Sequence, residues 1–492
     1  MNTTTATDPV LDPSQAPPPP GPTLRETPAV LRRAQRSVLG VTTELAETYG
    51  DVSMVRAGGQ NIVFLRGADV SRHVLVTAQD RYTKPSLFQL FRPALGEGLF
   101  TSEGETWRRS RRMVQPLFAK RHLAPYADHM AAAATRALDR WEAEWPTAHE
   151  IDVDAEILHV GLDTVGRALV SHDFSADAAD IERGLANALH EIGAMARSPG
   201  VMVGQGMKHV GAVRAARLTT PRRWRRYVAD ADAMDQRIVE VVDQRIRDGH
   251  GDHDDLLRLL METEDEEGGG TLSRRQVIDE IKTFIFAGHE TTAHGLSFMQ
   301  MLLAENPDVR DRLHAELDEV LGDRVPTVQD AARLPYLEAC FNEAMRLYPP
   351  AWHVPRDAAE DDVVGGYRIP AGARIMVAIW ATHRDPAVYP EPDAYRPERW
   401  LDDAQKSRPR FSFLPFGGGR RACVGQGFAM LNAMILGAMI SQRYTFERTT
   451  TGPIELGASI TLRPLHGIPM RPERRTSRRP GTDSATNGAG TT

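Results

Sequence analysis

One short segment constrains this 492-residue chain more than any other, Phe416-Gly-Gly-Gly-Arg-Arg-Ala-Cys-Val-Gly425. Its glycines let backbone amides approach the sulfur of Cys423 closely, and glycine adopts positive φ without strain. Arg420, Arg421 and a helix that begins just before the apolar residues from Phe428 would all lower the pKa of the thiol. A cysteine that only fills a core needs none of these neighbours. The pattern therefore predicts a thiolate ligand at Cys423.

Composition excludes several other classes of protein. Cys340 and Cys423 are the only cysteines, too few for a disulfide framework, a zinc knuckle or a four-thiolate cluster. The net charge of −7 argues against nucleic acid as a partner. Apolar runs such as Leu431–Ile440 are shorter than the roughly 18–20 residues of a membrane span, and the N-terminus has no signal-peptide pattern. We expect a cytoplasmic protein without a transmembrane anchor, by default a monomer.

The chain between the two ends has a predominantly helical pattern. Ser273 and Gln276 form a capping box before an apolar helix through Phe286. Asn306-Pro307 begins a helix that Gly322 ends, and another helix ends before Pro349-Pro350. The acidic stretch Glu262–Glu267 is expected to be a solvated loop.

Short strands complete the predicted fold, which is mainly α with a small β region. A hairpin is expected from Val52–Arg56 and Ile62–Arg66, with further strands around Val363–Ile369 and Arg374–Ile379. We predict one large domain over residues 23–470. Residues 1–22 would form a disordered Pro-rich arm with a stiff Pro17–Pro20 segment, and 471–492 a disordered tail.

The cysteine segment resembles the FxxGxRxCxG signature of the cytochrome P450 family, with Phe416, Gly419, Arg421, Cys423 and Gly425 in its fixed places. The resemblance covers roughly residues 30–465. It implies the cytochrome P450 fold and a haem b (iron protoporphyrin IX) with Cys423 as the ligand to its iron. Phe416 and Gly417 would lie at the cofactor.

A second match is Ala287-Gly-His-Glu-Thr291, which is similar to the family's [AG]Gx[DE]T motif. In the family reading, Gly288 opens a slot for dioxygen, Thr291 hydrogen-bonds the oxygen, and Glu290 relays protons from water. The alternative is an ordinary bend in a buried helix, with Glu290 solvated. His289 would occupy a generic family position.

Further matches concern structure and haem propionates. Glu343-x-x-Arg346 and Pro397-Glu-Arg399-Trp400 resemble the family's ExxR and PERF patterns and would brace the cysteine region. Trp107 and Arg111 fit the WxxxR pattern, and Arg111, Arg356 and Arg421 would pair with propionates. The neighbours of Arg111 in the basic stretch, Arg108, Arg109 and Arg112, form either a solvated helix face or a docking surface for an acidic electron donor.

The resemblance implies a monooxygenase that uses O₂ and electrons derived from NAD(P)H. No G-x-G-x-x-G unit or cluster cysteines indicate a fused reductase, so a separate ferredoxin or flavodoxin and its reductase are expected. A peroxide-driven peroxygenase and a non-enzymatic haem sensor or carrier remain alternatives. A helical protein with a structural cysteine and no haem is a more distant one.

The family alignment also predicts the lining of the substrate pocket. It would come from Ser86–Phe100, Phe284–Gly288, Ala351–Val354 and Ala458–Thr461. These segments are largely apolar and aromatic, which favours a terpenoid, fatty acid or steroid-like substrate. His353 is the polar exception, and it could bond substrate or a propionate or face solvent. The basic stretch Pro221–Arg226 would lie near the access channel.

Overall fold

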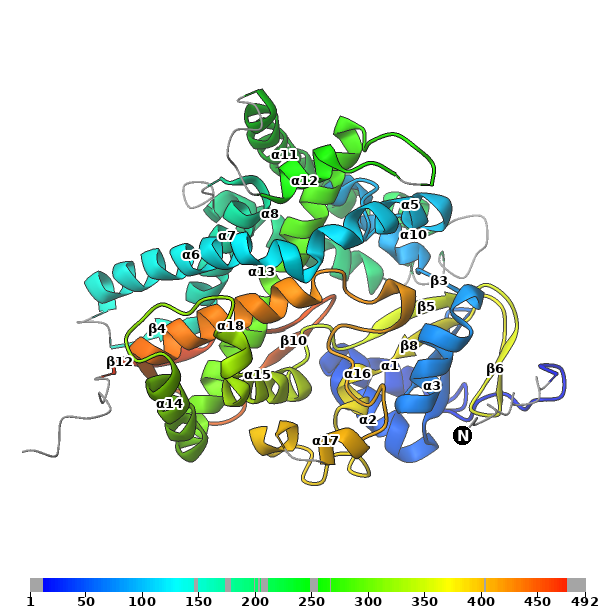
Figure 1. Ribbon diagram of the computed structural model, residues 1–492. Helices are drawn as coiled ribbons and strands as arrows, with labels where there is room; N and C mark the ends of the chain where they lie inside the picture. Colours follow the sequence, from blue (N-terminus) through cyan, green and yellow to red (C-terminus); the bar gives the residue numbers. More distant parts are fainter. Residues whose placement is uncertain are drawn as a thin grey trace, which may run out of the picture.

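The computed structural model describes residues 12–145, 149–172, 178–198, 200–201, 204, 211–247, 255–265, 267–401 and 404–475. Helices make up most of this part of the chain, and the small sheets lie on different sides of them (Figure 1). The predicted fold class, mainly α with a small β region, is confirmed. No helix in the described ranges combines the length and apolarity that a membrane span requires.

The longer helices are α1 (Thr27–Arg36), α2 (Val38–Tyr49), α5 (Gly104–Val114), α6 (Leu123–Glu144), α7 (Val153–Val170), α8 (Ala178–Ala196), α10 (Gly211–Thr219), α11 (Pro221–Arg247), α12 (Leu256–Glu262), α13 (Arg274–Glu305), α14 (Pro307–Val320), α15 (Pro335–Leu347) and α18 (Gln426–Arg443). Short helices are α3 (Ala68–Arg72), α4 (Arg92–Leu95), α16 (Ile379–Thr382) and α17 (Ala404–Ser407).

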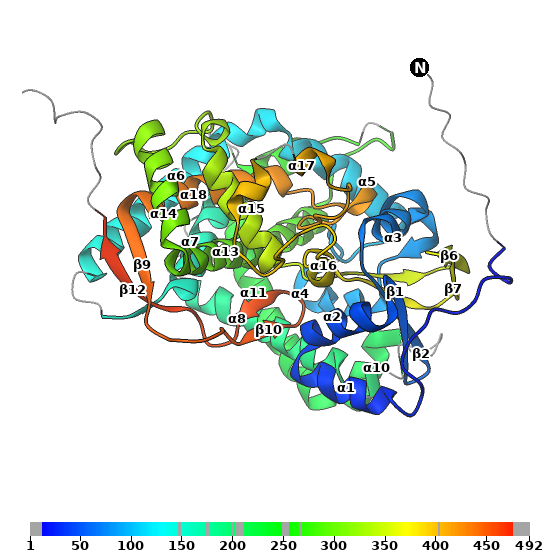
Figure 2. The same cartoon turned by 90° about the horizontal axis from the view of Figure 1, so that it is seen from below.

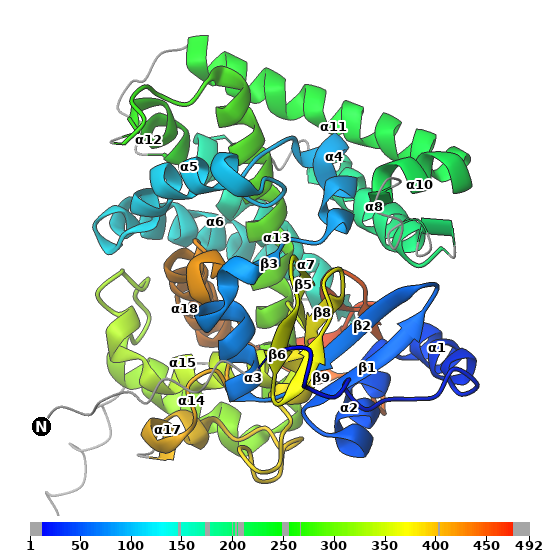
Figure 3. The same cartoon turned by 90° about the vertical axis from the view of Figure 1, so that its right-hand side faces the viewer.

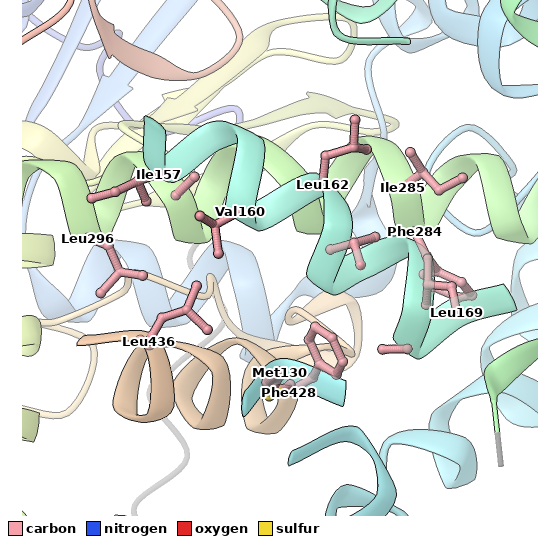
Figure 4. Close-up of a cluster of buried hydrophobic side chains, with 14 of the residues drawn as sticks. Met130, Ile157, Val160, Leu162, Leu169, Phe284, Ile285, Leu296, Phe428 and Leu436 are labelled. Carbon is pink, nitrogen blue, oxygen red and sulfur yellow. The ribbon is translucent and has the colours of Figure 1, made fainter. Parts of the chain in front are cut away.

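Helix α13 is the central element, and it runs through the middle of the molecule in Figure 3. It begins with the predicted capping box of Ser273 and Gln276 and continues for 32 residues, well beyond Phe286. Most of its side chains are buried all round, as expected of a helix in the centre of a large core. In Figure 4, Leu296 of α13, Val160 of α7 and Leu436 of α18 lie in the core between these helices.

The sheets are small and mostly antiparallel. The largest has the order β1-β2-β8-β5-β3, and the others are β10-β11, β4-β12-β9 and β6-β7. Their strands are β1 (Val52–Ala57), β2 (Gln60–Leu65), β3 (Tyr82–Thr83), β4 (Ile151–Asp152), β5 (Val354–Ala358), β6 (Asp362–Val364), β7 (Tyr367–Ile369), β8 (Arg374–Val377), β9 (Tyr444–Arg448), β10 (Leu456–Ala458), β11 (Leu462–Pro464) and β12 (Pro469–Arg474).

The hairpin predicted across Gly58-Gly59 is present as β1 and β2. The short strands expected around Val363–Ile369 are present as a second hairpin, β6 and β7, that turns at Gly365-Gly366. Both of these glycines have positive φ, which explains why the chain reverses there.

The ends of the chain are more ordered than predicted. The Pro20 carbonyl accepts from the Met54 amide of β1 at 2.8 Å, and the Pro17 carbonyl accepts from Arg368 of β7 at 2.8 Å. This segment passes β7 and β1 before α1 in Figure 2. At the other end, β12 pairs with β9 as far as Arg474, so the boundary predicted at 470 cuts a strand. Residues 1–11 and 476–492 of the predicted arm and tail lie outside the described residues.

The acidic stretch is solvated as predicted at Glu262, Glu264 and Glu267, but not at Asp265. Asp265 is buried, and its carboxylate accepts from Arg109 Nε and Arg112 Nε of α5, each at 3.1 Å. Those two arginines therefore take part in an ion-pair network, because burial of Asp265 requires charge partners. The docking surface considered for them stays a prediction. Arg108 pairs with Glu105 on the same helix.

Candidate active site

The cysteine loop is built around its glycines. A 3-10 turn, Gly419–Arg421, precedes Cys423, and α18 begins at Gln426, as the sequence predicts. Gly419 has φ +70°, and a Cβ there would lie 1.8 Å from the Leu75 carbonyl oxygen. A Cβ on Gly425 would lie 4.0 Å from Cys423 Sγ. Only glycine can occupy position 419. The loop places Cys423 just before the first residue of α18.

The thiol of Cys423 is open to a large cavity. Burial raises its pKa, while the Gly425 amide and the charge of Arg111 act to lower it. Arg111 Nη1 donates to the Ala422 carbonyl at 2.8 Å, which fixes this cation beside the cysteine. A metal ion bonded to the sulfur would provide the further stabilisation that a thiolate requires.

The prediction that Arg420 and Arg421 lower the thiol pKa is wrong. Arg420 pairs with Asp80, and Arg421 pairs with Glu103. Both guanidinium groups are held by residues that lie far earlier in the chain, and this arrangement is not visible in the local sequence.

The cavity beside Cys423 has a volume of about 1770 Å³. A pocket for one small molecule has about 300–1,000 Å³, so this cavity can accommodate a macrocycle and a guest together. All four predicted segments contribute to its lining, although Leu90 is buried behind it. Helix α8 contributes as well, through residues such as Ile192 and Gly193, which the sequence did not indicate.

A cluster of cations, Lys84, Arg356 and Arg421, lies at the cavity wall. Arg356 is buried, and burial together with Arg421 lowers its pKa to about 10, against the opposing effect of Glu103. Burial lowers the pKa of Lys84 to about 7, and Nζ donates to the carbonyls of Leu99 and Ser102 at 2.7 and 2.8 Å.

Trp107 is buried beneath this cluster. The guanidinium carbon of Arg421 and the ammonium of Lys84 lie 5.1 and 5.8 Å from the centre of its ring. Among the described residues, the acids that favour the charged forms of Arg356 and Lys84 are Glu103 and Glu280. Three cations, Lys84, Arg356 and Arg421, thus lie near two carboxylates, and a ligand that brings further carboxylates, such as a haem, fits the site.

Arg111 occupies a different position from these cations, against the cysteine loop. Its Nε donates to Gln115 at 2.9 Å. The role predicted for it, pairing with a propionate, stays a prediction. Lys84 is the cation that the sequence analysis missed, because a single lysine before a proline carries no local signal.

Helix α13 presents the predicted acid and alcohol to the same cavity. Glu290 and Thr291 both line it. Glu290 Oε2 accepts from Thr461 Oγ1 at 3.2 Å, and the hydroxyl of Thr291 donates to the Ala287 carbonyl at 2.7 Å. The reading in which Glu290 is solvated is wrong, since its side chain is buried.

Gly288 lines the cavity as well, but α7 gives a second reason for this glycine. A Cβ there would lie 3.3 Å from Val165 Cγ2, so the missing side chain allows close packing of α7 on α13. The predicted slot for dioxygen stays a prediction. His289 is buried and does not line the cavity, which agrees with a position without ligand function.

Aromatic side chains form the part of the wall nearest α4. Phe88 stacks on Phe100 with ring centres 4.9 Å apart, and Phe91 and Phe286 meet edge to face at 5.6 Å. His353 faces the cavity with its ring 3.8 Å from that of Trp352. Burial, together with the charge of Arg374, lowers the pKa of His353 to about 3, so its imidazole is neutral. Its Nδ1 is buried without a hydrogen-bond partner in the described structure.

The basic stretch at the start of α11 contributes nothing to the cavity lining among the described residues. Arg223 of this stretch pairs with Glu191 of α8, at 2.8 Å, and α8 itself lines the cavity. The basic stretch thus contacts a helix that lines the cavity and does not line the cavity itself.

The Glu343 and Arg346 pair lies outside the cavity and is fully buried. Arg399 Nε and Trp400 Nε1 donate to the Glu343 carboxylate at 3.1 and 2.9 Å. Arg346 also donates to the carbonyls of residues 383, 392 and 394, in the segment that leads to the cysteine loop. These contacts brace the segment, as predicted, and place no group at the cavity.

Comparison with known proteins agrees with this site. The family description "Cytochrome P450" matches residues 16–468. Cyclooctatin synthase of Streptomyces melanosporofaciens is 35% identical over 430 residues, covering 87% of this chain and 88% of that protein. Cyclooctat-9-en-7-ol 5-monooxygenase of the same organism is 33% identical, covering 80% of this chain and 82% of that protein.

A solved structure supports the same assignment. The crystal structure of the cytochrome P450DA haem domain superposes with a TM-score of 0.80 at 25% identity, covering 94% of this chain and 99% of that one. The signature around Cys423, the cavity that this residue faces and the match over nearly the whole chain lead to one conclusion. The chain belongs to the cytochrome P450 family of haem-thiolate monooxygenases.

Proposed function

We propose that this monooxygenase inserts one oxygen atom from O₂ into a small apolar substrate of the terpenoid class. One observation carries the proposal. The Cys423 thiol, the Glu290–Thr291 pair and an aromatic wall all face a single cavity of about 1770 Å³. This arrangement combines a metal ligand, a proton source and an apolar binding site within one space.

The residues present would hold haem b in a defined orientation. Cys423 would ligate the iron, Phe416 and Gly417 would lie at the same end of the group, and Arg356, Arg421 and Lys84 would neutralise the propionates with Trp107 beside them. When bound, the haem supplies the activation of dioxygen, which a thiolate ligand favours by donating electron density. Two electrons per turnover must reach the site, and we propose that a separate ferredoxin or flavodoxin with its NAD(P)H-dependent reductase supplies them.

The side chains of α13 would manage protons. Glu290 is held by the Thr461 hydroxyl at the cavity wall, where it can exchange protons with water. The hydroxyl of Thr291 donates to the Ala287 carbonyl, which leaves its oxygen able to accept a further hydrogen bond from the cavity side. An acid next to an alcohol can thus pass a proton from water to an oxygen atom that is being reduced.

The cavity wall favours a rigid apolar substrate. Four phenylalanine rings, from residues 88, 91, 100 and 286, contact one another and form a continuous aromatic surface. The neutral imidazole of His353, with Nδ1 unpartnered, offers one polar contact for a hydroxyl or carbonyl group. The names of two relatives, cyclooctatin synthase and cyclooctat-9-en-7-ol 5-monooxygenase, also support a terpenoid over a fatty acid or a steroid.

Turnover under oxygen-18 gas tests the proposal. The purified protein, a ferredoxin, its reductase and NADPH are incubated with diterpene hydrocarbons and alcohols, with fatty acids and with steroids, and products are analysed by mass spectrometry. We expect one oxygen-18 atom in a terpenoid product, and loss of this product when the electron donor is omitted. Equal turnover with hydrogen peroxide alone would favour a peroxygenase, and turnover of fatty acids only would overturn the substrate class.

A further inference from the structure

A buried hydrogen-bonded pair, His294 of α13 and Asp154 of α7, joins the two helices outside the cavity. His294 Nδ1 and Asp154 Oδ1 are 2.9 Å apart, and their side chains are 3% and 7% exposed. Asp154 lies in the first turn of α7, and 140 residues separate it from His294. Neither side chain lines the cavity. The pair therefore has no direct part in holding haem or substrate.

Glu290 nevertheless connects this pair to the cavity. Glu290 and His294 are four residues apart on α13, so they lie on one face of the helix, a turn apart. Glu290 is the member of this row that lines the cavity. The second ring nitrogen of His294, Nε2, is buried and has no hydrogen-bond partner in the described part of the protein. One nitrogen is thus fixed by Asp154, while the other is uncommitted.

The charges around His294 favour the imidazolium. Burial lowers the pKa of His294, but the charge and hydrogen bond of Asp154, with the charge of Glu290, outweigh burial and leave the pKa raised. Arg463 of β11 opposes them. His289 lies on the same helix, and burial and the charge of His294 lower its pKa to about 4, although Asp154 opposes this shift.

The last ionisable group of the cluster is His159 of α7, which acts with His294 to lower the pKa of His289. A protonated His294 therefore contacts Asp154 and lies one helical turn from Glu290. Coulomb attraction is strong at a site from which water is excluded, so the two carboxylates stabilise this charge.

We propose that His294, held by Asp154, is a positioning residue that orients Glu290 for proton delivery. This inference rests on the proposed function of Glu290, and it goes beyond that function by adding α7 to the proton-delivery apparatus. The imidazolium attracts the carboxylate from inside the protein, while the Thr461 hydroxyl holds it from the cavity side at 3.2 Å. Loss of the positive charge would remove this attraction and leave Glu290 held by the Thr461 hydroxyl.

An NMR titration of the full-length haem protein tests the coupling without turnover. Histidine rings are labelled with nitrogen-15, and the protein is kept in its diamagnetic reduced, carbon monoxide-bound form. We expect His294 to titrate above the ordinary histidine value of about 6.5. Glu290→Gln should lower the pH at which His294 titrates, with about a tenfold change in its ionisation constant, because an opposite charge nearby shifts a pKa by about one to three. Asp154→Asn should lower this pH by at least as much. An unchanged midpoint in Glu290→Gln would overturn the proposal, whether or not the wild-type protein turns over a substrate.

The ratio of product formed to NADPH consumed during turnover provides the second test. This ratio should fall as pH rises through the midpoint of His294, because the imidazolium is lost there. His294→Gln should lower the ratio and remove that dependence on pH. His289→Gln, the matched control on the same helix, should keep the dependence, because His289 is already neutral.

A double-variant cycle separates this role from a merely structural one. If His294 acts through Glu290, then His294→Gln should add little to the loss caused by Glu290→Gln. Losses that multiply in the double variant would overturn the proposal. If His294→Gln fails to incorporate haem, Asp154→Asn, which keeps the shape of the side chain, takes its place in the same cycle. Failure of the wild type to oxidise any substrate would count against the proposed function, and the NMR titration would still decide the inference.

Discussion

Replacement of Arg346 by methionine should destabilise the protein by about 3–5 kcal/mol. Arg346 is fully buried and makes five hydrogen bonds, two to Glu343 at 2.8 and 2.9 Å and three to backbone carbonyls. Methionine conserves much of the volume, so the loss comes mainly from the polar groups left behind. Domains of ordinary stability have about 5–15 kcal/mol in total, so the change removes a large fraction.

Urea denaturation followed by circular dichroism measures this loss. The matched control is Arg33→Met, because Arg33 pairs with Glu44 at the surface, where both side chains are 49% exposed. Such a pair contributes about 0–1 kcal/mol, so the control should unfold like the wild type. A loss below about 1 kcal/mol for Arg346→Met would refute the reasoning that this buried network braces the segment before the cysteine.

Three further predictions follow from the site. Gly419→Ala should abolish haem incorporation, because its Cβ would overlap the Leu75 carbonyl. The control Gly366→Ala, with φ +82° and nothing within 4 Å of the added Cβ, lies outside the cavity and should cost only about 1–2 kcal/mol of strain and keep the pigment. Lys84 has a pKa of about 7, so it carries its charge below that pH. Haem affinity, measured by titration, should therefore weaken as pH rises above about 7. Lys84→Met should remove this dependence on pH. Asp265→Asn should lower the free energy of unfolding by about 2 kcal/mol, because its charged hydrogen bonds to Arg109 and Arg112 are lost. The control Glu267→Gln, at the exposed end of the same loop, should change this free energy by less than about 1 kcal/mol.

The features that the sequence predicted well are local ones. The capping box of Ser273 and Gln276 uses residues three apart, and the cysteine loop depends on glycines within ten residues. The Glu343–Arg346 pair is also local, being one helical turn. Each of these patterns can be recognised in the sequence because the interacting residues lie within one short stretch of chain.

The features that the sequence missed depend on residues far apart in the chain. Asp265 is buried only because α5, more than 150 residues earlier, brings Arg109 and Arg112 to it. Arg421 is held by Glu103 for the same reason, so its charge does not act on the thiol as the local sequence implied. No periodicity or spacing indicates such pairs, since they form only when the tertiary fold brings the elements together.

The Pro-rich arm shows the limit of composition as a guide. Prolines cannot donate backbone hydrogen bonds, but their carbonyls accept, and Pro17 and Pro20 each accept one from a strand. A segment with a disordered composition can therefore be ordered along the edge of a sheet.

The absorption spectrum of the reduced, carbon monoxide-bound protein tests most directly whether Cys423 binds haem iron through its thiolate. Wild type should show the strongly red-shifted Soret band of a thiolate-ligated haem, and Cys423→Ser should lose it. The other cysteine provides the control, because Cys340 is buried in α15 away from the cavity, so Cys340→Ser should keep the band. A red-shifted band that persists in Cys423→Ser would contradict the account.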